Sequence, residues 1–288
     1  SPGEFYQLDC ETSFMTSKEF HDLMEPLFVE LTENVAGKKV KEKPFPRIAF
    51  KECMETYGSD RPDLRYDMKI VDATAWGKGS DFKVFSGADS VRALMVQGGA
   101  AFSRKEIDGE FTDAAKRAHA KGLAWTKLVD GKFEGGVSKF FTEEQLAELK
   151  SITKAEEGSI IFFGAGDWET SLTGLGAVRH LAGDKLDLKD PNEIAWAWIV
   201  DFPMYEWDSN NEKVDFGHNP FSMPIGGMES LETKEPLDIL ADQYDIIANG
   251  LELSSGAVRN KDPEVMYKAF ALAGYSKADV DEKFGHMI

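Results

Sequence analysis

The chain has 288 residues, of which 42% are hydrophobic, and its formal net charge is −18 at pH 7. This length allows one large domain or two moderate ones, no stretch approaches the apolar length of a membrane span, and the acidic balance argues against nucleic-acid binding through overall charge. The two cysteines, Cys10 and Cys53, lie far apart in the sequence and suit a reducing cytosol.

Residues 5–12 alternate as in a strand, with Phe5, Gln7, Asp9 and Glu11 on one face. A face that begins with an aromatic ring and continues with carboxylates is a poor core. We therefore expect this face to form the floor under a polar ligand, although a strand aromatic such as Phe5 can also belong to a core.

A helix is predicted to begin at Thr16, because Thr16 and Glu19 have the spacing of a capping box. The helix is expected to end near Gly37. Its apolar residues recur at helical spacing and predict a core face: they are Phe20, Leu23, Met24, Leu27, Phe28 and Leu31.

The middle of the chain differs from its ends in the pattern of its predicted helices and strands. A loop rich in glycine, proline and charge is predicted over residues 57–65. The elements predicted after it are a helix from Ser103 to about Gly122, a strand over 123–129 closed by Asp130-Gly131, a helix opened by Thr142, a strand over 159–163 and a helix over 168–181. Such alternation of short strands and amphipathic helices describes a small α+β module.

Towards the C-terminus, a strand is predicted over residues 196–206, followed by a proline-pinned loop over residues 218–224 that contains His218. Asp262 followed by Pro263 predicts the start of one helix. Ser276 with Asp279 predicts the start of the last helix.

The segment around Asn249-Gly250 predicts a β-hairpin, because a type I′ turn needs positive φ at both central residues. This turn places Ile247 opposite Glu252, so Asp245 points to the same face as Glu252. Two facing carboxylates repel each other, and a hard divalent cation that carries phosphates would resolve the repulsion. The alternative interpretation is a solvated polar face.

Arg259 follows the hairpin on the same strand, and a bulge over residues 254–256 would turn it toward the same cleft. Two acids and an arginine on one hairpin indicate a site for a nucleotide, a metal ion and an anionic small molecule.

Five segments together resemble the bacterial-type aspartyl-tRNA synthetases, a family of class II synthetases. These segments are residues 3–9, 57–65, 201–204, 218–221 and 244–259. The resemblance covers essentially the whole chain. It implies an α+β fold in which residues 1–66 and 196–288 form part of the class II antiparallel sheet flanked by helices. Residues 67–195 would form a small inserted α+β domain, which the family shares with a subunit of the tRNA-dependent amidotransferases.

The resemblance also implies a function, that of an aspartate–tRNA ligase. Such an enzyme uses ATP and Mg²⁺ to activate L-aspartate as aspartyl-adenylate and then transfers it to the 3′ end of tRNA. The family's anticodon-binding barrel, dimer-forming motif and last arginine motif are not among these residues, so we expect a fragment that is inactive alone. The full-length protein is expected to be a cytoplasmic homodimer that binds tRNA and has no membrane segment.

The resemblance assigns roles to the acidic and aromatic residues, with no covalent catalytic nucleophile, because catalysis would rest on positioning and charge stabilisation. Phe5 would stack on the adenine ring, and Gln7 would line the adenylate. Asp9 would accept hydrogen bonds from the ammonium group of the amino acid. Asp245 and Glu252 would hold Mg²⁺ against the ATP phosphates.

Two further residues would select the amino acid. Arg259 would clamp the side-chain carboxylate of aspartate and reject the neutral amide of asparagine. His218 would close over the aspartate on its loop, although a lone histidine can equally be a surface residue. Many family members carry a second histidine where this chain has Asn219.

Two other functions are compatible with part of the sequence. An amidotransferase subunit that carries the same inserted module would explain residues 67–195, but it gives no reason for Asp9, Asp245, Glu252 and Arg259 together. A non-catalytic paralogue of the synthetase is the second alternative. A paralogue that has lost catalysis would be expected to have lost ligand-binding side chains, but all of those expected at these positions are present.

Overall fold

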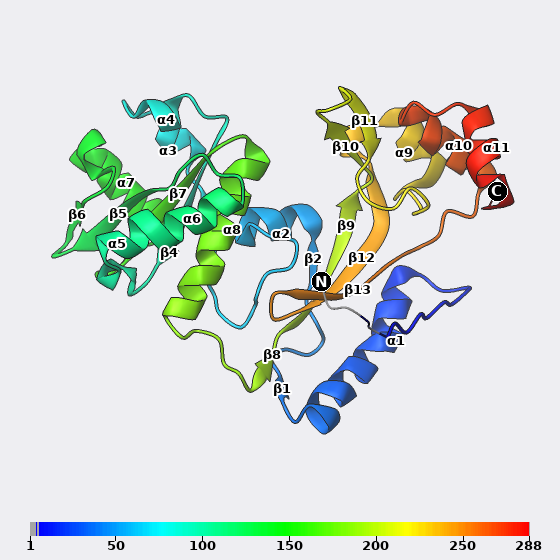
Figure 1. Cartoon of the computed structure of the whole chain (residues 1–288), viewed down its shortest axis with the longest axis horizontal. Coiled ribbons are helices and arrows are strands. Elements are labelled where there is room, and N and C mark those ends of the chain that lie inside the picture. The colour runs from blue at the N-terminus through cyan, green and yellow to red at the C-terminus, as the bar shows by residue number, and fades with distance from the viewer. Residues whose placement is uncertain (1–3, 5, 288) are drawn as a thin grey trace. The chain divides into compact units, whose positions relative to one another are not determined.

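The computed structural model describes residue 4 and residues 6–287 (Figure 1). The chain divides into two compact units, each built from segments that are separated in the sequence. The first unit comprises Ser1–Lys38, Pro203–Gln243 and Gly256–Ile288, and the second comprises Lys39–Phe202 and Tyr244–Ser255. Among the helices of the described residues, none is both long enough and apolar enough to cross a membrane.

The first unit begins with a stretch that has no regular structure. Residues 6–12 form neither helix nor strand, and their side chains are exposed. The strand predicted over residues 5–12 is therefore wrong for residues 6–12, and Phe5 lies outside the described residues. A strand forms only where a neighbouring strand shares its backbone hydrogen bonds, and none of the described strands pairs with this stretch.

The first helix, α1 (Ser17–Glu30), begins where the capping box predicts it. The Glu19 amide donates to Thr16 Oγ1, and the Thr16 amide donates to Glu19 Oε2 at 2.7 Å. The helix continues as a π-helical turn over Leu31–Val35 and ends before Gly37, whose φ is +64°.

The apolar stripe of α1 is less buried than predicted. Leu23, Leu27 and Leu31 are 56%, 41% and 45% exposed. An apolar stripe is buried only where a second apolar surface covers it, and other elements form the buried clusters of the first unit. The predicted core face is therefore wrong for these three leucines.

The buried core of the first unit lies between a hairpin and the C-terminal helices. Strands β10 (Tyr205–Asp208) and β11 (Lys213–Phe216) pair antiparallel. Tyr205 Oη donates to the carbonyl of Ala269 at 2.8 Å. This hydrogen bond connects the hairpin to α10. The helices are α9 (Gly227–Thr233), α10 (Pro263–Leu272) and α11 (Lys277–Phe284). Both predicted C-terminal helix starts, at Asp262 and Ser276, are confirmed.

A four-stranded sheet has the strand order β13–β12–β9–β2, and the chain passes between the two units within β12 and β13. The strands are β2 (Arg47–Ala49), β9 (Trp196–Pro203), β12 (Leu240–Ala248) and β13 (Leu251–Ala257). β2 pairs with β9 in parallel, so this sheet is not antiparallel throughout. The strand predicted over residues 196–206 is in fact two strands, β9 and β10.

The second unit contains a cluster of buried side chains on this sheet, formed by Cys53, Ala197, Ile199, Phe202 and Ile247. Helix α2 (Phe50–Tyr57) covers the sheet there and ends at Gly58, whose φ is +68°. Residues 58–65 are irregular, as predicted. Two short strands that are far apart in the sequence, β1 (Lys39–Val40) and β8 (Glu193–Ile194), pair in parallel.

The largest element of the second unit is a five-stranded antiparallel sheet with the order β3–β4–β7–β5–β6. Its strands are β3 (Ile70–Asp72), β4 (Ser90–Val96), β5 (Ala124–Val129), β6 (Lys132–Glu134) and β7 (Ile160–Gly166). The elements predicted from Ser103 to Leu181 are present, but the first helix has a π-helical interruption at Ile107–Phe111 and ends at Arg117, before the predicted end near Gly122.

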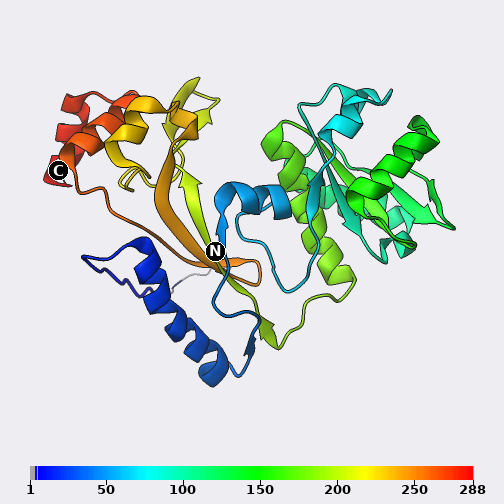
Figure 2. The same cartoon turned by 180° about the vertical axis from the view of Figure 1, so that it is seen from behind.

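Helices cover both faces of this sheet (Figures 1 and 2). Leu94 and Phe162 belong to a buried cluster with α6 (Thr112–Arg117), α8 (Trp168–Lys185) and the π-helical turn Ile107–Phe111, which follows α5 (Arg104–Glu106), on one side. Ala93 and Phe163, the neighbours of Leu94 and Phe162 in their strands, belong to a cluster with α3 (Thr74–Lys78), α4 (Lys83–Ser86) and α7 (Glu143–Thr153) on the other side. Because side chains alternate along a strand, the two clusters lie on opposite faces. The domain boundaries at residues 66 and 195 stay a prediction.

Candidate functional site

The hairpin that carries two acidic residues forms as its sequence predicts. Asn249 and Gly250 have φ of +52° and +88°, the positive values that a type I′ turn requires. A two-residue turn pairs Ile247 with Glu252, so Asp245 and Glu252 lie on the same face of the hairpin.

Asp245 is a buried carboxylate, only 7% exposed, whereas Glu252 is exposed. Burial, the charge of Glu252 and the charge of Asp60 raise the pKa of Asp245 to about 7. Among the described residues, no hydrogen bond or ion pair to the Asp245 side chain is present. A cation beside Asp245 would stabilise the charged carboxylate that burial and its two acidic neighbours destabilise.

Asp60 is a functional candidate that sequence reasoning missed. It stands in the irregular loop that follows α2, almost two hundred residues before the hairpin, and it contributes to the raised pKa of Asp245. Its only signal in the sequence is its place in a loop rich in glycine and charge. Its approach to Asp245 depends on a long-range contact, which spacing in one sequence does not reveal.

The structure offers a metal ion a small number of protein ligands. Within the described part of the chain, no three or more histidine, cysteine, aspartate or glutamate side chains assemble as a metal-binding group. Mg²⁺ is commonly held by one or two carboxylates together with water and substrate phosphates. Asp245 and Glu252 fit this kind of site, in which the nucleotide supplies the remaining ligands.

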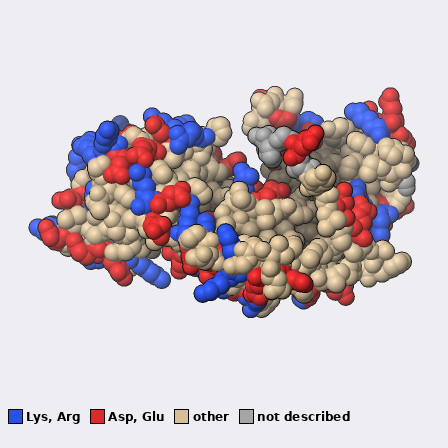
Figure 3. All heavy atoms as spheres, turned by 60° about the horizontal axis from the view of Figure 1, so that its bottom comes forward, with Lys and Arg blue, Asp and Glu red and all other residues tan. Residues whose placement is uncertain are grey.

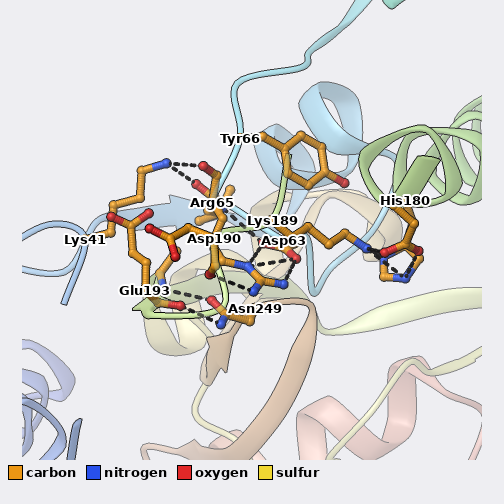
Figure 4. Close-up of polar contacts among 12 residues, drawn as sticks. Lys41, Asp63, Arg65, Tyr66, His180, Lys189, Asp190, Glu193 and Asn249 are labelled. Atoms are coloured by element: carbon orange, nitrogen blue, oxygen red, sulfur yellow. Dashed lines mark hydrogen bonds and ion pairs between the residues drawn. The ribbon is translucent and has the colours of Figure 1, made fainter. Parts of the chain in front are cut away.

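The tip of the hairpin is held from two sides (Figure 4). Asn249 Oδ1 accepts from the amide of Ala195 at 2.9 Å, and Asn249 Nδ2 donates to the carbonyl of Glu193 at 3.0 Å. On the other side, a Cβ built on Gly250 would lie 3.6 Å from the Cβ of Asp63. The turn at Gly250 therefore lies beside Asp63, close enough that an added methyl group would touch it.

Asp63 and Arg65 form a bidentate ion pair under this tip (Figure 4). Arg65 Nε and Nη2 donate to the Asp63 carboxylate at 3.0 Å and 2.6 Å, and the Arg65 amide donates to it at 3.0 Å. Burial would raise the pKa of Asp63, but the hydrogen bonds from Arg65 outweigh it and lower the pKa. Arg65 Nη1 also donates to the carbonyl of Asp190 at 3.1 Å.

In the first unit, the loop that contains His218 pairs with the segment that contains Arg259. Ser222 and Arg259 form an antiparallel bridge. The Met223 amide donates to the carbonyl of Val258 at 2.7 Å, and the Asn260 amide donates to that of Phe221 at 2.7 Å. Backbone pairing thus fixes the base of the His218 loop beside Arg259. His218 and Arg259 are both exposed.

A register change near Arg259 agrees with the predicted bulge. The two-residue turn sets Asp245 opposite Ser254, but the Val258 amide donates to the carbonyl of Asp242. Three steps along β12, from Asp245 to Asp242, thus match four steps from Ser254 to Val258, the residue that directly follows β13. The additional residue lies between Ser254 and Val258, which includes the predicted segment 254–256.

The remaining predicted site residues lie in the irregular N-terminal stretch. Gln7 and Asp9 are exposed, and Gln7 Nε2 donates to Asp9 Oδ1 at 2.7 Å. The structure therefore brings together Asp245 with Glu252, the His218 loop with Arg259, and Gln7 with Asp9. The convergence of all of them on one pocket stays a prediction, as does any role of Phe5.

Comparison with known proteins covers the whole chain. A family model described as class II tRNA synthetases (D, K and N) matches residues 1–288. An aspartate–tRNA(Asp/Asn) ligase of Chlorobium phaeobacteroides is 46% identical over 292 residues, covering 100% of this chain and 48% of that protein. An aspartate–tRNA ligase of Streptomyces avermitilis is 49% identical over 289 residues, covering 100% of this chain and 49% of that protein. The chain spans about half the length of the curated relatives it matches.

Proposed function

Because the chain belongs to the class II tRNA synthetases of the D, K and N type, we propose that it is part of an aspartate–tRNA ligase. The observation that carries this proposal is the buried Asp245 beside Glu252 on the hairpin. The proposal is supported by relatives of that name, which match the chain from end to end. In the proposed reaction, the aspartate α-carboxylate attacks the α-phosphate of ATP and pyrophosphate leaves. The tRNA 3′ hydroxyl then attacks the aspartyl-adenylate, and AMP leaves.

The hairpin acids are proposed to hold the metal ion and orient the nucleotide. Asp245 and Glu252 would share one Mg²⁺, which, when bound, neutralises charge on the triphosphate. Asp245 is suited to this role because it has no competing partner among the described side chains. Glu252, which is exposed, would meet the nucleotide from the solvent side.

Arg259 is proposed to recognise the side-chain carboxylate of aspartate. A planar guanidinium donates two parallel hydrogen bonds to a carboxylate but finds no matching acceptor pair in the amide of asparagine. The bridge between Ser222 and Arg259 supports a fixed position for the backbone of this residue. His218, in the loop that pairs with this segment, would close over the bound amino acid.

The N-terminal residues are proposed to complete the site. Asp9 would bind the ammonium group of aspartate, Gln7 would line the adenylate, and Phe5 would stack on adenine. The mutual hydrogen bond of Gln7 and Asp9 is compatible with both side chains turning to one ligand. An exposed, irregular stretch must become ordered around that ligand, at an entropic cost.

Residues 67–195 are proposed to form the inserted domain. Two observations support this: the strands of the five-stranded sheet lie between Ile70 and Gly166, and its two buried clusters are built from residues 66–182 and 73–163. The remaining residues, 1–66 and 196–288, would belong to the catalytic domain.

The full-length protein is proposed to act as a cytoplasmic homodimer that binds tRNA. On the face in Figure 3, lysine and arginine side chains are scattered among acidic ones. With a net charge of −18, this chain would meet a polyanion through local contacts only.

The proposal is tested by isothermal titration calorimetry on the complete protein that contains this chain. The titrants are L-aspartate, ATP with Mg²⁺, and a non-hydrolysable aspartyl-adenylate analogue. We expect all three to bind, the analogue most tightly, because it joins the contacts of both substrates. Arg259→Ala should weaken aspartate and the analogue by about 100-fold, since it removes one partner of a charged pair, and should change ATP binding by less than about twofold.

Arg117→Ala is the matched control, because Arg117 is an exposed arginine of the same chain. It should leave all three affinities unchanged. Aspartate binding that is unaffected by Arg259→Ala would contradict the assigned role of Arg259. A protein that binds neither aspartate nor the analogue would contradict the proposed function itself.

A further inference from the structure

Arg179, in the middle of α8, is a buried arginine that binds backbone carbonyls. It is only 2% exposed. Its Nε donates to the carbonyl of Met68 at 2.7 Å, and its Nη2 donates to those of Asp63 and Tyr66 at 2.9 Å and 3.1 Å. Burying a guanidinium costs free energy unless its donors are satisfied. Here three backbone carbonyls of one irregular segment satisfy them.

Lys41, from another part of the second unit, binds the two carbonyls between those of Asp63 and Tyr66. Its Nζ donates to the carbonyls of Leu64 and Arg65, both at 2.7 Å (Figure 4). A segment without regular structure has no sheet or helix partners for its carbonyls, which must find donors elsewhere. Each carbonyl from residue 63 to residue 66 is thus bound by a basic side chain.

Ring contacts and glycines bring α8 close to the same segment. The Arg179 guanidinium lies 4.2 Å from the ring centroid of Tyr66 and 4.9 Å from that of Tyr57. Tyr66 Oη donates to the Arg179 carbonyl at 3.2 Å. A Cβ built on Gly176 would lie 2.1 Å from the carbonyl oxygen of Gly58. The backbones of α8 and of Gly58, at the end of α2, are therefore in direct contact just before the segment that Arg179 binds.

The segment of residues 63–68 also lies beside the tip of the hairpin formed by β12 and β13. A Cβ on Gly250 would lie 3.6 Å from the Cβ of Asp63 and 3.9 Å from the carbonyl oxygen of Arg61. Arg65 joins Asp63 to the carbonyl of Asp190, and Asn249 binds the backbone of residues 193 and 195. The tip is thus held by Asn249 to residues 193 and 195, and it lies beside Asp63, whose carbonyl Arg179 binds.

We propose that Arg179 is a positioning residue for the hairpin carboxylates: by holding the carbonyls of residues 63, 66 and 68, it fixes the seat of Gly250 and hence the place of Asp245 and Glu252. The functional part of this inference rests on the proposed function, in which these acids hold Mg²⁺. Its structural part concerns the hairpin alone. Helix α8, which belongs to the proposed inserted domain, would thus help to position the two metal-binding carboxylates through Arg179.

Arginine is required at this position because it has five donors in a planar fork. A lysine at position 179 would keep the charge but could not reach all three carbonyls in their present directions. We therefore choose Arg179→Lys as the test variant. Tyr66→Phe, which removes the hydroxyl that contacts Arg179, is a milder second variant that answers the question if Arg179→Lys does not fold.

The first measurement is amide hydrogen exchange on the complete protein, which needs no activity. Arg179→Lys should speed exchange at the hairpin amides of residues 246–253 by about tenfold, because their seat is loosened. The amides of the hairpin formed by β5 and β6, which serves as the control, should change their exchange rates by less than about twofold. Equal acceleration in both hairpins would mean general destabilisation and would overturn the proposal.

The second measurement is aspartate-dependent exchange of pyrophosphate into ATP at varied Mg²⁺. Arg179→Lys should raise the Mg²⁺ concentration for half-maximal rate by about tenfold, as expected when support for a metal ligand is lost. The KM for aspartate should change by less than about twofold. Arg92→Lys is the matched control, because Arg92 is a largely buried arginine that contacts Asp72 and Ser90 instead; it should leave the Mg²⁺ dependence unchanged.

The outcomes separate the two proposals. If the unaltered protein exchanges pyrophosphate and Arg179→Lys leaves its Mg²⁺ dependence unchanged, the positioning role is wrong while the proposed function stands. If the unaltered protein shows no aspartate-dependent exchange, the proposed function fails. The hydrogen-exchange result then decides alone whether Arg179 positions the hairpin.

Discussion

Asp245 is a residue whose environment opposes its own charge. It is 7% exposed, and Glu252 and Asp60 add negative charge around it. Such an arrangement lowers the stability of the protein whenever the carboxylate is ionised. A bound cation reverses this effect, so the same unfavourable placement favours metal binding.

The raised pKa of Asp245 predicts how stability depends on pH. The folded-state pKa of about 7 lies above an unfolded value of about 3.9, so the folded state binds the proton more tightly. Stability contributed by the protonated form is therefore lost as the pH rises from about 4 to about 7. We expect Asp245→Asn, which carries no charge, to lose less stability across this range.

Urea denaturation in the presence of EDTA measures this difference. The free energy of unfolding of Asp245→Asn, relative to the unaltered protein, should increase by about 2 kcal/mol between pH 5 and pH 8. Asp89→Asn, at an exposed aspartate, is the control and should follow the unaltered protein. Parallel pH curves for Asp245→Asn would show that Asp245 keeps an ordinary pKa in the folded protein.

At the residue scale, the sequence predicts what local geometry determines. The same-face placement of Asp245 and Glu252 follows from the turn alone, because the side-chain period of a strand is two. Asp60 and Arg179 could not be found in this way. Arg179 meets Asp63 across 116 positions of the chain, and nothing in a single sequence reports that contact.

Elements were predictable where short-range chemistry decides their ends. The helix starts predicted at Thr16, Ser103, Thr142 and Ser276 are all present, each as a capping box, because the hydrogen bonds of a capping box lie within four residues. The strand over residues 5–12 failed because a strand depends on a partner. The core face of α1 failed for three leucines for the same reason, since burial depends on a second surface.

The hairpin turn gives a prediction at this scale. Gly250 has a φ of +88°, which a residue with a Cβ adopts at a cost, so Gly250→Ala should lower the free energy of unfolding by about 1–2 kcal/mol. Urea denaturation measures the loss. Gly109→Ala is the control, because Gly109 has no atom within 4 Å of its Cβ position and no positive φ. It should be neutral or slightly stabilising, and an equal loss in both variants would contradict the turn assignment.

At the scale of the whole molecule, the division into two units was beyond sequence reasoning. The chain crosses between the units after Lys38 and inside β9, β12 and β13, so three of the four boundaries fall inside strands and leave no linker composition to find. The change in texture between residues 67 and 195 was visible, because local helix and strand patterns produce it. Which segments pack together depends on long-range contacts, and these determine the units.

In the proposed function, the hairpin acids and Arg259 together serve the activation of aspartate. The most direct test is pyrophosphate exchange into ATP by the complete protein, with L-aspartate or L-asparagine and Mg²⁺. We predict exchange with aspartate, none with asparagine, and a rate at least about 100-fold lower in Glu252→Gln, which loses a metal ligand. Unchanged exchange by Glu252→Gln, or exchange with asparagine in place of aspartate, would contradict the account.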